Sequence, residues 1–284
     1  MGIGSGWTIS KRTDDSGLAG RMSIGGLCAT LLVVAGLAMF NLAAEAAATP
    51  TTATLRVKVI PIPVNPRLPH GPSYPGTGNI LGAGAAFDGE LRIQGTEYGG
   101  FPPPLTGVTI FTPAGAKLHP QGFATCPEAI LESHEVARCP QRSDFSSNGS
   151  AQGVVSFGST RVHEKLTLQA FFAPNGRIAA YAEGTSPALI EILATADITT
   201  AAPAFGQKFS AVVPLVETVP EAPYAVVESV QMTVGPAYKQ GKRVVPYITL
   251  PRKCPKGGFP ARTELSFLIG PPVVIDTRLP CPKR

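Results

Sequence analysis

Histidine and closely spaced carboxylates are the side chains in this sequence that could carry out acid–base chemistry. His163-Glu164 begins like the zinc-protease motif HExxH, but residue 167 is Thr and the segment reads as a strand, so the motif fails. Two carboxylate pairs could in principle act on a glycan: Glu132/Glu135 and Glu217/Glu221. Isolated carboxylates of this kind are far more often solvated surface groups. No glycine-rich nucleotide loop or serine-hydrolase elbow follows a strand. The sequence therefore predicts no catalytic residue and no cofactor.

The cysteines are the second group with chemical meaning. With residues 1–48 set aside as an export segment, four remain: Cys126, Cys139, Cys254 and Cys281. An even number in an exported chain indicates disulfides, and of the three possible pairings sequence order favours Cys126–Cys139 and Cys254–Cys281. The spacings are not CxxC, and no histidine lies two to four residues from any cysteine. We therefore predict two local disulfides and no metal site.

Positive charge gathers around the second cysteine pair. The formal net charge is +5, and residues 251–284 carry seven Lys or Arg against two Asp or Glu. The candidate anion-binding patch consists of Lys242, Arg243, Arg252, Lys253, Lys256 and Arg262. Such a patch attracts anionic polymers or lipid headgroups, although lysines that only maintain solubility are commoner. The predicted partner is an anionic envelope polymer or a membrane surface, with no nucleic acid.

The elements that must position these residues are strands. The chain is 44% hydrophobic and 15% charged, with 31 Gly and 29 Pro, which is typical of a turn-rich all-β protein. Segments of alternating polarity recur through residues 53–277, and the clearest is 160–172, which Asn175-Gly176 joins to 177–183 as a hairpin. We predict an antiparallel β-sandwich of the jelly-roll kind. One short helix is expected over 127–134, between Cys126 and Cys139.

Residues 244–270 are expected to form the main hairpin of the C-terminal part. Two runs of alternating polarity, 244–250 and 262–269, flank a connection rich in Pro, Gly and Lys that contains Cys254. Alternation with such punctuation predicts two antiparallel strands joined by this connection.

The N-terminal part differs in composition from the rest. Residues 1–22 supply a basic lead, residues 24–44 are apolar and uncharged, and alanines 46–48 follow. These are the three parts of a secretory signal peptide, and about 20 apolar residues also suffice for a membrane anchor. Three regions are therefore predicted: a signal peptide or membrane anchor over 1–48, a short strand and a proline- and glycine-rich linker or arm over 49–84, and a disulfide-stapled β-sandwich over 85–284.

Four segments carry a resemblance to known sequences: GTEYGGFPPP at 95–104, PAGAKLHPQGFATC at 113–126, VPLVETVP at 213–220 and LPRKCPKGGFP at 250–260. On these segments the chain resembles a group of exported actinobacterial proteins that have no assigned function. The resemblance covers roughly residues 78–270. It implies export and a cysteine-stapled β fold, and it transfers no catalytic residue.

Two function classes follow. The preferred one is an exported cell-envelope protein that acts as a non-catalytic binding or structural module. The alternative is a secreted hydrolase acting on an envelope polysaccharide or ester. A deep cleft with convergent ionisable groups favours the hydrolase, and an open positive surface favours binding. The only tryptophan, Trp7, precedes the expected mature chain, which counts against a carbohydrate-stacking platform.

Overall fold

The structure is a computed structural model, and it describes residues 47–62, 84–241, 243–251 and 253–281. The predicted export segment up to residue 46, including the apolar stretch 24–44, lies outside the described residues, as do linker residues 63–83. Residues 47–284 form one compact unit. Within the described part of the chain, no helix has the length and apolar character needed to cross a membrane.

One antiparallel sheet of thirteen strands dominates the unit, in the order β15-β14-β3-β9-β8-β7-β6-β5-β10-β2-β13-β4, with β1 paired to β2. Its strands are β1 (Thr52–Ile62), β2 (Gly84–Gln94), β3 (Leu105–Pro113), β4 (Lys117–Leu118), β5 (Ser146–Phe157), β6 (Thr160–Phe172), β7 (Ile178–Gly184), β8 (Ile190–Thr200), β9 (Phe205–Val212), β10 (Val226–Val234), β13 (Ile248–Thr249), β14 (Phe259–Phe267) and β15 (Val273–Leu279). A separate two-stranded sheet joins β11 (Ala237–Gln240) to β12 (Arg243–Pro246). The helical elements among the described residues are α1 (Glu128–Glu132) and two 3₁₀ turns, Val136–Arg138 and Pro174–Gly176.

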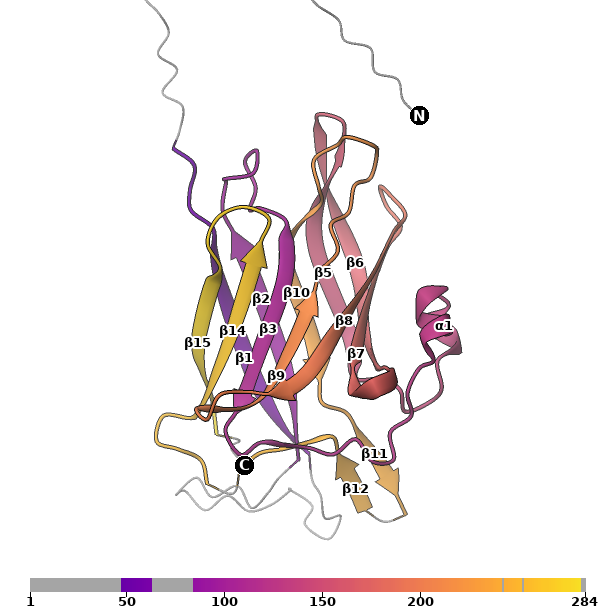
Figure 1. The fold of residues 1–284 in the computed structure, drawn as a ribbon, viewed down its shortest axis with the longest axis vertical. Coiled ribbons are helices and arrows are strands. Elements are labelled where there is room, and N and C mark those ends of the chain that lie inside the picture. Colours follow the sequence, from indigo (N-terminus) through magenta and orange to yellow (C-terminus); the bar gives the residue numbers. More distant parts are fainter. Residues whose placement is uncertain (1–46, 63–83, 242, 252, 282–284) are drawn as a thin grey trace, which may run out of the picture. The chain divides into compact units, whose positions relative to one another are not determined.

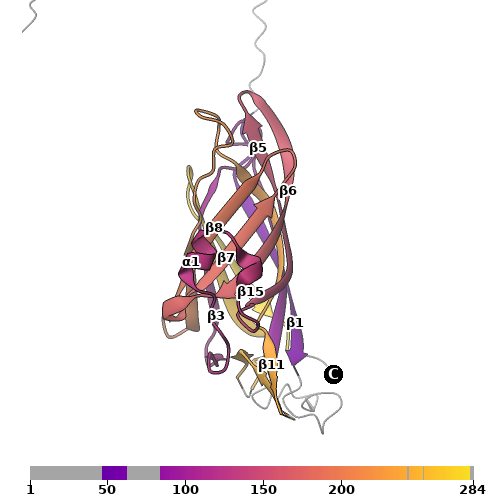
Figure 2. The ribbon, with the colours of Figure 1, turned by 90° about the vertical axis from the view of Figure 1, so that its right-hand side faces the viewer.

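The large sheet folds back on itself into two layers. In Figure 1, β15, β14, β3 and β9 lie in front of β1, β2, β10 and β5, and β8, β7 and β6 continue the sheet from one layer to the other. Figure 2 shows the same strands from the side that carries α1. The first strand, β1, which pairs with β2, and the last strand, β15, come together, with Val59 of β1 and Leu279 of β15 in one core cluster. The predicted all-β antiparallel sandwich with one short helix is confirmed.

The hairpin of β6 and β7 forms where alternation and turn chemistry agree. The two strands pair from Thr167 opposite Glu183 to Phe172 opposite Ile178. Asn175 and Gly176 take the left-handed backbone conformation, with φ of 61° and 73°, which these two residue types adopt most readily. The hairpin predicted from 160–183 is confirmed.

The strand expected ahead of the main domain is part of its sheet. β1 pairs with β2 along its whole length, from Thr52 opposite Gln94 to Ile62 opposite Gly84. Its inward residues alternate with exposed polar ones, so the two-residue period seen in the sequence matches the observed burial. The sheet therefore begins at Thr52, before the linker residues.

The hairpin predicted over 244–270 is wrong. The first run divides into β12, which pairs with β11, and β13, which pairs with β2 and β4. The second run is β14, and its partners are β3 and β15. Alternation identified the strands but not their partners, because pairing depends on side-chain packing and chain topology far away in sequence.

The core fills the space between the two layers. Near the ends of β2 and β14, Leu91, Ile93, Leu265 and Phe267 pack together, and Leu265 is fully buried. Burying a side chain of this size stabilises the fold by about 1.5–3 kcal/mol. Inner residues of β6, β8 and β3 are covered less completely: Ile110 lies on the same face as Val108 yet is 47% exposed.

Candidate functional site

A short helix covers the outer face of β6 and β7, and the candidate site lies at its edge. The predicted Cys126–Cys139 disulfide is present, with the two Cα atoms 4.9 Å apart, and it closes the segment that contains α1. Leu131 of α1 packs on Phe171, Ala179 and Tyr181, all buried although they face outward from the sheet. The segment thus stabilises apolar residues that the second layer cannot reach.

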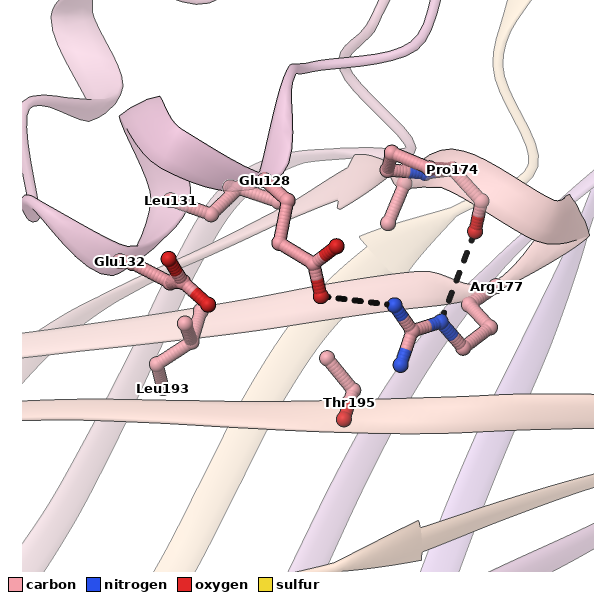
Figure 3. Close-up of a pocket in the computed structure, with 8 residues that line it drawn as sticks. Glu128, Leu131, Glu132, Pro174, Arg177, Leu193 and Thr195 are labelled. Carbon is pink, nitrogen blue, oxygen red and sulfur yellow. Dashed lines mark hydrogen bonds and ion pairs between the residues drawn. The ribbon is translucent and has the colours of Figure 1, made fainter.

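A pocket of about 190 Å³ lies between α1, residues 173–177 and strand β8. Its lining residues are Glu128, Leu131, Glu132, Ala173, Pro174, Arg177, Leu193 and Thr195. Figure 3 shows Arg177 directed at Glu128, and its Nη2 donates to Glu128 Oε1 at 3.0 Å. Because this ion pair occupies one polar wall, the pocket is suited to a small molecule at most, well below the size of a polymer-binding cleft.

A second polar cluster fixes the end of the same segment on the sheet. Tyr181 donates its hydroxyl to Glu191 Oε1 at 2.8 Å, and His134 Nδ1 lies 3.1 Å from Glu191 Oε2. The hydrogen bond from Tyr181, and then that from His134, holds the pKa of Glu191 below its usual value. Burial, followed by the hydrogen bond to Glu191, raises the pKa of Tyr181. A tyrosine that keeps its proton in this way is a poor base, so the role of the cluster is to hold the segment on the sheet.

Glu164, which the sequence brought up only as part of the failed HExxH motif, is a buried carboxylate on the inner face of β6. It is 1% exposed, and it accepts hydrogen bonds from the backbone N–H groups of Ser186 at 3.1 Å and Ala188 at 3.2 Å. The alternation along β6 could have identified Glu164 as an inward residue, because position 164 falls between inward Val162 and Leu166. Its carboxylate holds the β7–β8 connection rather than facing a pocket.

The other residues considered for acid–base chemistry are dispersed. His163 is 71% exposed at its side chain and lies 3.3 Å from Glu228, so it is a solvent-facing strand residue. Glu135 pairs with Arg138, whereas Glu132 lines the pocket. No group of three metal-binding side chains occurs within the described ranges.

The predicted Cys254–Cys281 disulfide is also present, with the Cα atoms 6.0 Å apart. It ties down residues 253–258, here called the basic loop, in which Lys253 and Lys256 are exposed. Lys242 and Arg252 lie outside the described residues, and only the backbone of Arg243 is described, in β12.

Arg262 differs from the lysines of the basic loop because its charge is matched. It stands on β14 and donates to both carboxylate oxygens of Asp276, from Nε at 2.8 Å and from Nη2 at 3.1 Å, with Glu264 at 3.8 Å. Asp276 raises the pKa of Arg262, and Arg262 lowers the pKa of Asp276. Of the six candidate residues, Lys253 and Lys256 are thus the two that the structure shows exposed and close together in sequence.

Comparison with known proteins adds no relative. No family model, curated protein or solved structure matches the chain. The functional argument therefore depends on the chain's own residues.

Proposed function

We propose that the protein is an exported, non-catalytic binding module of the cell envelope, and that the basic loop is its contact with anionic envelope polymer. The observation that carries this proposal is the exposed pair Lys253 and Lys256, which the Cys254–Cys281 disulfide fixes in one short loop. The two disulfides support export, because such bonds persist in oxidising compartments outside the cytosol.

A fixed pair of lysines binds a polyanion more effectively than two mobile ones. Each lysine near an anionic surface contributes about 1 kcal/mol, and a loop held by a disulfide loses less conformational entropy when it binds. The attraction acts over about 10 Å at 0.1 M salt, so binding should weaken as salt is added.

The test measures binding of residues 47–284 to poly-L-glutamate and to isolated envelope polymer as salt rises from about 0.05 to about 0.5 M. Over this range the distance across which charges attract one another falls from above about 10 Å to below it. Lys253→Gln together with Lys256→Gln should weaken binding about thirtyfold at low salt, from about 1 kcal/mol per lysine. The matched control removes two exposed lysines elsewhere, Lys58→Gln with Lys165→Gln. Equal losses in the two double variants would show that net charge, not the basic loop, determines binding.

Arg262→Gln provides a finer control within the predicted patch. Because Asp276 already binds the guanidinium through two hydrogen bonds, we expect this variant to change polyanion binding less than Lys256→Gln does.

The second candidate is a secreted hydrolase acting on envelope polysaccharide or ester. The observation that favours it is that Glu128 and Glu132 both line the pocket beside α1, since two carboxylates are the usual equipment of a glycosidase. Release of sugar or acid from isolated envelope by the protein, lost in Glu132→Gln, would replace the binding proposal with this one.

A further inference from the structure

The pocket beside α1 combines apolar walls with charged side chains. Its apolar part includes Leu131 and Ala173, each 2% exposed, together with Leu193 of β8. Its charged part consists of Glu128, Glu132 and Arg177. Which of these charges are already matched decides what kind of ligand the pocket can take.

Arg177 has its partners within the wall of the pocket. Its Nη2 donates to Glu128 Oε1 at 3.0 Å, and its Nε donates to Pro174 O at 3.5 Å. Figure 3 shows both contacts on one side of the pocket and Glu132 on the other. Because the pair of Arg177 and Glu128 is neutral as a whole, an anion that entered the pocket would compete with Glu128 for the guanidinium.

Glu132 has no such partner. It takes part in no ion pair among the residues that the structure describes. Two carboxylates against one guanidinium give the charged lining residues a net charge of −1. A ligand with one positive charge therefore complements the pocket, whereas a negative ligand is repelled.

The size of the pocket restricts the ligand to a small molecule. An apolar cavity of about 150 Å³ holds benzene, and this pocket has about 190 Å³. One aromatic ring or a short aliphatic group with an amino group fits such a volume, and a polymer segment does not. A calcium ion needs about six to eight oxygen ligands, more than the carboxylates of the pocket provide.

The pocket is formed before a ligand arrives. The Cys126–Cys139 disulfide closes the segment that contains α1, and His134, beyond the end of α1, lies 3.1 Å from Glu191 of β8. A site fixed in this way loses little conformational entropy on binding, so a single ion pair and a small apolar contact are enough for weak but specific binding.

We propose that the pocket beside α1 binds a small organic cation, namely an apolar group that carries one protonated amine. The ammonium group contacts the carboxylate of Glu132, the hydroxyl of Thr195 offers a further acceptor, and the apolar group packs on Leu131 and Leu193. This site goes beyond the proposed function, and it requires neither the basic loop nor hydrolysis.

The experiment compares benzylamine, benzyl alcohol and benzoate, three probes of similar size that are positive, neutral and negative at pH 7. Binding to residues 47–284, which form one compact unit, is measured from the NMR shifts of the methyl groups of Leu131 and Leu193. We expect benzylamine to bind in the millimolar range, benzyl alcohol more weakly and benzoate not at all.

Glu132→Gln should lower the affinity for benzylamine about fivefold, the effect of losing one ion pair at a surface. The matched control is Glu135→Gln, because Glu135 is exposed in the same segment, pairs with Arg138 and does not line the pocket. This control should leave binding unchanged. Arg177→Gln should act in the opposite direction and strengthen binding, since it leaves Glu128 without its cation.

Three results would overturn the proposal: equal affinity for benzylamine and benzyl alcohol, equal loss in Glu132→Gln and Glu135→Gln, or benzylamine shifts that leave Leu131 and Leu193 unaffected. Failure of the polyanion test would reject the proposed function and leave this proposal standing, because poly-L-glutamate and benzylamine are expected at different residues.

Discussion

A carboxylate on the inner face of a strand is tolerated only where the backbone satisfies it. Glu164 accepts two backbone N–H groups from the β7–β8 connection, and Gly184 leaves it room, since a Cβ there would stand 2.6 Å from its Oε1. A buried charge without such partners would cost several kcal/mol. Glu164 thus holds the β7–β8 connection against β6.

Glu164→Gln should destabilise the fold by about 1–3 kcal/mol, because the new amide group cannot accept both backbone N–H bonds and leaves one buried donor unpaired. Urea unfolding midpoints give the measurement. Glu183→Gln, the same change on the outer face of β7, should alter the midpoint by much less. Equal midpoints for the two variants would show that Glu164 does not hold the β7–β8 connection.

At the scale of elements, the α1 segment is an addition to the sheet that needs its own stabilising contacts. A five-residue helix has little stability by itself. It is held by the Cys126–Cys139 disulfide, by Leu131 in an apolar socket, and by the cluster of His134, Glu191 and Tyr181. The small pocket exists because these contacts hold the helix beside β8.

The cluster makes the stability of the segment depend on pH. The pKa of Glu191 is lowered in the folded state, chiefly by the hydrogen bond from Tyr181. The carboxylate therefore contributes stability above its ordinary pKa of 4.5, and that contribution is lost as pH falls through the lower folded value. Glu191→Gln should be less stable than the parent protein at pH 7, and the difference should shrink by about pH 3.

Urea midpoints of the two proteins at both pH values provide the measurement. Tyr181→Phe removes the largest cause of the lowered pKa and should likewise flatten the pH dependence. A difference between parent and Glu191→Gln that is the same at both pH values would refute the assignment.

At the scale of the whole unit, the two layers meet where β1 and β15 come together. Val59 of β1 and Leu279 of β15 share a core cluster with Phe259 of β14. Cys254 packs against this cluster and is joined to Cys281, so the contacts that close the sheet also hold the basic loop in place.

Much of the local structure could be predicted from the sequence because its causes are local. Alternation along β1 and β6 reports which side chains face the core, since neighbouring residues of a strand point to opposite faces. Asn175-Gly176 specifies its own turn through left-handed conformations. The two disulfides followed sequence order because each closes a short loop, of 13 and 27 residues.

The tertiary structure alone decided which strands meet and which side chains converge. Residues 244–250 carry a valid strand pattern, yet their partners are β2, β4 and β11 rather than the nearby β14. Arg262 looked like free positive charge until pairing of β14 with β15 set Asp276 opposite it. Such placements depend on long-range pairing of the whole sheet, which alternation within one strand does not encode.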